Sequence, residues 1–127
     1  MKIGIVATHS FPIPWKTHSG DVVILDLAAG LLELGHDVTV YAPTGTVVPE
    51  GCQLLDMPCA WGKYPPPAEQ CEKECFDKNT DALRSEDMVH DFSVCKQVAW
   101  SLHREDRKNV VVTPLGGTWG YLSRPLN

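Results

Sequence analysis

Hydrophobic residues recur along the chain in two alternating patterns: short unbroken runs, and longer segments with helical spacing. The runs at 2–7, 38–42 and 109–113 are rich in Val and Ile, which is typical of parallel strands buried on both faces. Shorter runs at 52–57 and 86–91 predict two more strands. Strands that alternate with helices predict an α/β domain with a Rossmann-like open parallel sheet and flanking helices. Six strand side chains are expected in the core: Ile3, Ile5, Val38, Val40, Val110 and Val112.

The first helix is predicted over residues 20–34. Ser19 is the candidate N-cap, and Gly35 follows the last apolar position, as expected of a residue just past a helix end. The polar positions Asp26 and Glu33 fall seven apart on one stripe. We therefore expect this helix to be buried over most of its circumference.

Three later segments complete the single domain expected over residues 1–127. Residues 58–67 contain four prolines and predict an irregular loop. The charged stretch 68–83 predicts a short helix without a clear apolar period. Residues 93–105 predict another helix, with its apolar side chains on one face.

Composition and charge restrict the classes of partner and environment that we expect for the protein. The formal net charge is −5, and no run of Lys or Arg offers a stripe that could follow a phosphate backbone, so a nucleic-acid partner is not expected. No apolar stretch is long enough for a transmembrane segment. The five cysteines are odd in number and unevenly spaced, which fits a reducing cytoplasm better than a secreted disulfide framework.

Two of the cysteines raise the question of a metal site. Cys71 and Cys75 are four residues apart, so on a helix their thiols would face the same way and could bind zinc. No second pair of Cys or His residues stands at ligand spacing. The alternative is that these cysteines are free thiols with a structural role, and we expect no bound metal.

The turn between the first strand and the first helix is the candidate phosphate site. Backbone N–H groups and the positive end of the helix would converge there, on a phosphate or sugar held by Lys16, Thr17, Ser19 and Gly20. The same residues also fit an ordinary turn in which Ser19 only caps the helix.

Ligands of open parallel sheets bind outside the carboxyl ends of the strands. The segments 8–20, 90–93 and 114–120 all lie on that edge. His90 could contact a ligand or hydrogen-bond Asp91, and the glycines and tryptophans of these loops could serve the fold alone. The candidate cleft residues are His9, Trp15, His90, Asp91, Gly116, Gly117, Thr118 and Trp119.

Several of these motifs resemble a known family. Residues 16–22 resemble the Lys-Thr-Gly-Gly-Leu-Gly-Asp-Val signature of glycogen and starch synthases, one residue shorter, and 35–43 resemble a Gly-His-Glu-Val-Thr-Val stretch that ends in Pro. Residues 87–90 are similar to an Asp-Ile-Val-His strand end, and 111–118 to a later strand and loop. The chain thus resembles the N-terminal domain of retaining glycosyltransferases with two Rossmann-like domains. The resemblance implies the acceptor side of a cleft, a nucleotide-sugar substrate, a small-molecule acceptor and no cofactor.

The sequence departs from the family pattern at several positions, and these departures lower the transfer activity that we expect. His18 and Ser19 replace paired glycines, and Leu115 stands where the family often has a His. The family's donor-binding domain is a second domain, so we expect little transfer from residues 1–127 alone. A second chain or a homo-oligomer could complete the site. The alternatives are a small ligand-binding or partner-binding domain without enzymatic activity, and a flavodoxin-like regulatory domain. The sequence does not identify the catalytic residues.

Overall fold

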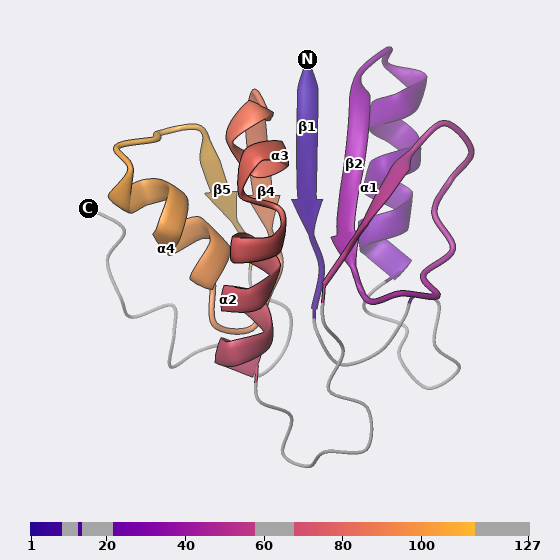
Figure 1. Ribbon diagram of the computed structural model, residues 1–127. Coiled ribbons are helices and arrows are strands. Elements are labelled where there is room, and N and C mark those ends of the chain that lie inside the picture. The colour runs from indigo at the N-terminus through magenta and orange to yellow at the C-terminus, as the bar shows by residue number, and fades with distance from the viewer. Residues whose placement is uncertain (9–12, 14–21, 58–67, 114–127) are drawn as a thin grey trace.

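The protein forms one all-parallel sheet flanked by helices, which confirms the predicted fold class (Figure 1). The structure is a computed structural model that describes residues 1–8, 13, 22–57 and 68–113. The five strands lie in the order β3-β2-β1-β4-β5. The elements are β1 (Lys2–Val6), α1 (Val22–Glu33), β2 (Asp37–Ala42), β3 (Gln53–Asp56), α2 (Ala68–Lys78), α3 (Thr80–Ser85), β4 (Met88–Asp91), α4 (Gln97–Arg104) and β5 (Val110–Val112).

The strand order contains a reversal beside the central strand β1. From β1 the chain proceeds outward through β2 to β3, and then crosses back to β4 and β5 on the other side. Ile3 of β1 is therefore in register with both Val38 of β2 and Met88 of β4. Loops that follow β1 and β4 diverge from this point, which makes it the topological switch point of the sheet.

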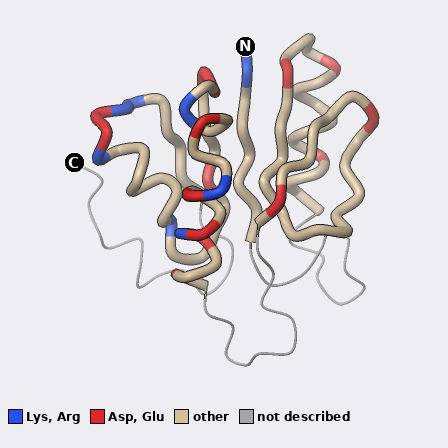
Figure 2. Tube along the Cα trace, in the orientation of Figure 1, with Lys and Arg blue, Asp and Glu red and all other residues tan. Residues whose placement is uncertain are grey.

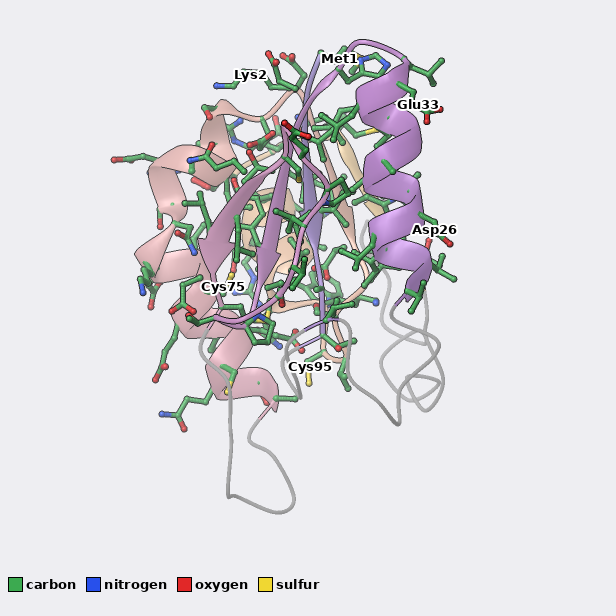
Figure 3. The ribbon with its side chains drawn as sticks, turned by 90° about the vertical axis from the view of Figure 1, so that its right-hand side faces the viewer. Met1, Lys2, Asp26, Glu33, Cys75 and Cys95 are labelled. Atoms are coloured by element: carbon green, nitrogen blue, oxygen red, sulfur yellow. The ribbon has the colours of Figure 1, made fainter. Side chains whose placement is uncertain are left out.

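Helices cover both faces of the sheet, with α1 on one face and the other helices on the opposite face (Figures 1 and 3). On the α1 face, Ile24 and Ala28 pack against Ile5 and Val40. On the other face, Cys75 of α2, Leu83 of α3 and two α4 side chains surround Val6 and Tyr41. The alternation of side chains along each strand sends neighbouring residues into different cores.

The end of α1 confirms the role predicted for Gly35. Gly35 has φ +89°, its N–H donates to the carbonyl of Leu32 at 3.0 Å, and the N–H of His36 donates to the carbonyl of Leu31 at 3.1 Å. These paired bonds form a Schellman motif, which requires a left-handed residue at this position. The turn delivers the chain directly into β2.

Replacing Gly35 by Ala should destabilise the fold by about 1 kcal/mol, because an L side chain at this φ strains the backbone. A Cβ at Gly35 would meet no atom within 4 Å, so no clash adds to the strain. Chemical denaturation measures the loss. Gly30→Ala, in the middle of α1 and also without a neighbour, is the control and should stabilise the protein slightly. Equal effects of the two substitutions would contradict this interpretation of the motif.

The expected burial of the first helix was wrong. Only Ile24 and Ala28 of α1 are fully buried, while Val22 and Val23 are exposed and Leu34, just after the helix, is 75% exposed. The reason is that α1 covers the sheet with one side, and no other described element packs on its outer side. Figure 3 shows Asp26 and Glu33 pointing away from the sheet.

The last strand is also less buried than predicted. Val110 and Val112 are half-buried and Val111 is 42% exposed, whereas Ile3, Ile5, Val38 and Val40 are buried as expected. Within the described residues, β5 is an edge strand with a helix on only one of its faces. A β-branched run identifies a strand but does not reveal how many layers cover it.

Two helix boundaries differ from the predictions. The segment 68–83 contains two helices, separated at Asn79, whose side-chain amide donates to the carbonyls of Cys75 and Asp56. The helix predicted over 93–105 begins only at Gln97. None of the helices in the described ranges is long and apolar enough to cross a membrane. The predicted loop 58–67 lies outside the described residues.

Candidate functional site

The candidate site lies at the carboxyl edge of the sheet, next to the switch point between β1 and β4. Thr8 follows β1, Phe92 and Ser93 follow β4, and Thr113 follows β5 at this edge. Ten predicted site residues belong to segments that leave from this edge but lie outside the described residues, so their roles stay predictions: His9, Trp15, Lys16, Thr17, Ser19, Gly20, Gly116, Gly117, Thr118 and Trp119.

One described residue fixes the chain between β1 and α1. The N–H of Ile13 donates to Thr46 Oγ1 at 3.0 Å, and the carbonyl of Ile13 accepts from the N–H of Val47 at 2.7 Å. The side chain of Ile13 is buried in the α1-side core, and Thr46 is also buried. The chain after β1 is therefore held against the turn that follows β2.

His90 is placed on the α1 face of β4, near its carboxyl end. Its Nε2 lies 2.6 Å from Thr113 Oγ1, and its ring stacks on Phe92 with centroids 4.2 Å apart. Burial lowers the pKa of His90 below its ordinary value, although the Asp91 carboxylate acts in the opposite direction. A neutral, half-buried imidazole joined to a hydroxyl can donate or accept one hydrogen bond at this edge.

Asp91 points to the opposite face of the strand, so the structure separates it from His90. The suggested His90–Asp91 hydrogen bond is wrong, because successive strand residues face opposite sides. Asp91 Oδ1 accepts from the N–H and hydroxyl of Ser93, and Oδ2 accepts from the N–H of Ala99 at 2.9 Å. The side chain is completely buried. Asp91 therefore caps the start of α4.

A second buried carboxyl group meets the same helix start. Glu72 of α2 is 0% exposed, and its Oε1 lies 3.0 Å from Ser93 Oγ and accepts from the N–H of Gln97 at 3.1 Å. Its Oε2 accepts from the N–H of Cys95 at 2.9 Å. Burial raises the pKa of Glu72 to about 7, which outweighs the effect of these hydrogen bonds.

The hydroxyl of Ser93 links the two carboxyl groups, and this arrangement requires one additional proton. Ser93 Oγ contacts both Asp91 Oδ1 and Glu72 Oε1, yet a hydroxyl has only one proton to donate. When both carboxyl groups are ionised, one of these two contacts has no hydrogen. A protonated Glu72 supplies the second hydrogen, which agrees with its raised pKa. The cluster of Glu72, Asp91 and Ser93 thus holds one titratable proton against α4.

Lys96 joins this cluster to the end of β5. The residue has a left-handed backbone (φ 58°), and its buried ammonium donates to the carbonyls of Ser93 and Thr113. Burial lowers the pKa of Lys96, against the influence of Asp91 and Glu72. Its left-handed backbone explains why α4 begins one residue later, at Gln97. The start of α4 is thus occupied by protein carboxyl groups and is not available to a ligand anion.

Four residues of this edge carry no role predicted from the sequence: Glu72, Ser93, Lys96 and Thr113. A signal for Ser93 was present, because Asp91 and Ser93 directly precede an amphipathic helix, as capping residues do. Glu72 gave no such signal: it lies in a charged segment, where a glutamate is normally solvated. Only the packing of α2 against α4 reveals its role.

Three of the described cysteines lie in the protein interior. Cys71, Cys75 and Cys95 are buried, and burial raises the pKa of Cys75 to about 12. Within residues 1–8, 13, 22–57 and 68–113, no three His, Cys, Asp or Glu side chains lie close enough together to bind a metal ion. Cys71 and Cys75 do share one side of α2, as predicted, but that side faces the protein interior.

Charge is distributed unevenly over the fold. Residues 22–57, which include α1, β2 and β3, contain acidic residues but no Lys or Arg, and the described basic residues other than Lys2 gather around α2 to β5 (Figure 2). Comparison with known proteins found no family model that matches the chain and no matching curated protein. The fold and the site geometry are therefore the basis for inferring a function.

Proposed function

We propose that residues 1–127 act as the acceptor-side, N-terminal domain of a retaining glycosyltransferase that uses a nucleotide-sugar donor. The observation that supports this proposal best is the switch point between β1 and β4. The segments that carry the glycosyltransferase-like motifs leave from the same edge, after Thr8 and Thr113. Ligands of open α/β sheets bind at such an edge. We also propose a cytoplasmic protein, because the five cysteines are odd in number and unevenly spaced, unlike a secreted disulfide framework.

In this proposal the residues that follow β1 and those at the ends of β4 and β5 have different roles. Lys16, Thr17, Ser19 and Gly20 would contact a donor phosphate or sugar through side chains and backbone N–H groups. His90, neutral and half-buried, would orient an acceptor hydroxyl together with Thr113. Asp91 would act indirectly, because its buried carboxylate holds Ser93 and α4 in place.

Residues 1–127 on their own should bind common nucleotide sugars no more tightly than roughly 1 mM and should transfer no sugar. One helix N-terminus and a few N–H groups contribute only about 1–3 kcal/mol, and the remaining stabilisation of a departing sugar belongs to a donor-binding domain. Calorimetry with UDP-glucose and ADP-glucose measures the affinity. A micromolar dissociation constant would contradict the proposed division of labour.

Gly20→Val should abolish any residual nucleotide-sugar binding, because a branched side chain prevents close approach of a phosphate to the backbone. Gly30→Val is the control, since a Cβ at Gly30 would meet no atom within 4 Å. Both variants should give the same far-UV circular dichroism spectrum. An unchanged affinity in Gly20→Val would place binding away from the first loop.

One observation favours the alternative of a partner-binding domain without enzymatic activity. Val22, Val23 and Leu34 expose apolar surface along one helix and its end, where a second protein surface could pack. Light scattering of the purified chain distinguishes the two proposals. A stable homodimer that Val23→Glu dissociates would favour the binding domain, and a monomer that gains transferase activity with a donor-binding chain would favour the enzyme.

A further inference from the structure

A polar cavity lies at the amino edge of the sheet, opposite to the candidate glycosyltransferase site. Its volume is about 270 Å³, which is enough for a small organic ligand. Three strands contribute to it, since Lys2 is in register with Asp37, and Thr39 with Gln53. Figure 3 shows Lys2 at this edge, pointing away from α1. The lining residues are Lys2, Asp37, Val38, Thr39, Gly51, Gln53 and Glu86.

The cavity exists because the helices cover only part of this sheet face. Near the carboxyl ends of β2 and β3, Tyr41 and Leu55 pack into the core formed with α2. Two and four residues earlier on β2, Thr39 and Asp37 share the face of Tyr41 but are not fully buried. Gln53 of β3 is exposed beside them. The polar half of the face is thus open next to the end of α3.

Glu86 borders this cavity with an oxygen that lacks a partner. The side chain is 6% exposed, and its Oε1 accepts from the Tyr41 hydroxyl at 3.2 Å. Its Oε2 is buried and has no hydrogen-bond partner among the described residues. A buried carboxyl oxygen without a donor is unusual in a folded protein and calls for an explanation. A ligand that donates a hydrogen bond would provide one.

The surrounding charges favour a cation. The carboxylates of Asp37 and Asp87 both act to raise the pKa of Glu86, after the larger effect of burial, which indicates that they lie close to it. Lys2, whose ammonium also donates to Ser85 Oγ at 3.2 Å, opposes them with a larger effect than either aspartate, but it is one cation beside the three carboxyl groups of Asp37, Glu86 and Asp87. No Lys or Arg occurs in residues 22–57, which form the rest of the wall (Figure 2). The cavity can therefore accept further hydrogen bonds, and its charge favours positively charged N–H donors.

We propose that this cavity is a binding site for a small organic cation with N–H donors, either a guanidinium or a primary ammonium group, which donates to Glu86 Oε2. The side chains of Thr39, Gln53 and Asp37 provide further acceptors around it. The planar fork of a guanidinium suits two carboxylates better than a compact ammonium does. The site is independent of the proposed glycosyltransferase edge, because it lies at the opposite ends of the strands.

Methylguanidinium chloride is the probe, with tetramethylammonium chloride at equal ionic strength as a cation that has no N–H donor. Titration followed by ¹H–¹⁵N NMR should show saturating shifts at the amides of Gly51, Gln53 and Glu86, with a dissociation constant on the order of 1 mM. Tetramethylammonium should leave these amides unchanged. Equal shifts with both salts, or shifts that do not saturate, would overturn the proposal and indicate charge screening only.

Two variants test the role of Glu86. Glu86→Gln keeps the shape of the side chain but removes its charge, and it should weaken methylguanidinium binding at least about tenfold. Asp26→Asn removes one exposed carboxylate on α1 and should leave binding unchanged. Thr39→Tyr fills the cavity without altering Glu86 and should abolish binding, which keeps the test decisive if Glu86→Gln does not fold. Unchanged affinity in either cavity variant would exclude this site.

Discussion

Truncation of Glu72 to Ala should destabilise the protein by about 3–5 kcal/mol, because it removes the partner of three polar groups that stay buried. These groups are the N–H groups of Cys95 and Gln97, which donate to Glu72, and the hydroxyl of Ser93. Water cannot replace the carboxyl group without opening the contact between α2 and α4. Urea denaturation followed by circular dichroism measures the loss of free energy of unfolding.

Two further variants of α2 make this measurement specific. Glu72→Gln keeps the shape of the side chain but has only one oxygen for the N–H groups of Cys95 and Gln97, so one of them faces an amide NH2. This variant should cost about 1–3 kcal/mol, less than the truncation. Glu69→Ala removes a glutamate from the same helix, where it forms an exposed ion pair with Lys73 at 3.2 Å. An exposed pair of this kind contributes about 0.5 kcal/mol or less. If Glu69→Ala and Glu72→Ala had similar effects, the cluster would not be what holds α4.

The sheet and the first helix could be predicted because their signals are local. A run such as 2–7 is long enough to identify a buried strand, and Gly35 marks the helix end by a conformation that favours glycine. Alternation of strands with helices then specifies parallel pairing, because a crossover returns each strand in the same direction. No long-range contact has to be known for these steps.

Burial and the start of α4 could not be predicted, since both depend on contacts that are distant in sequence. The apolar pattern of α1 is the same whether one layer or two cover it, so the exposure of Val23 and Leu34 became visible only in the fold. Residues 93–96 have helical spacing, but the N–H of Cys95 donates to Glu72, more than twenty positions earlier, and Lys96 has a left-handed backbone, so α4 begins only at Gln97. Within the candidate site, the sequence pattern identified His90 but not its partner Thr113.

Stability should decrease by about 3 kcal/mol as the pH rises from about 4.5 to 8, owing to the proton on Glu72. The folded-state pKa is about 7, above the ordinary value of 4.5. The folded protein therefore holds the proton more tightly than the unfolded chain does. The stabilisation is complete below pH 4.5, declines between the two pKa values, and is lost as the pH passes through about 7.

The difference between the wild-type protein and Glu72→Gln isolates this effect, because every other titrating group is common to both. Glu86, whose pKa burial also raises, contributes with the same sign. His90, whose pKa burial lowers, contributes with the opposite sign. Urea denaturation at several pH values should show the wild-type protein losing about 3 kcal/mol relative to Glu72→Gln as the pH rises from about 4.5 to 8. Parallel curves would mean that the proton of the cluster does not reside on Glu72, and that Ser93 donates to an ionised pair throughout.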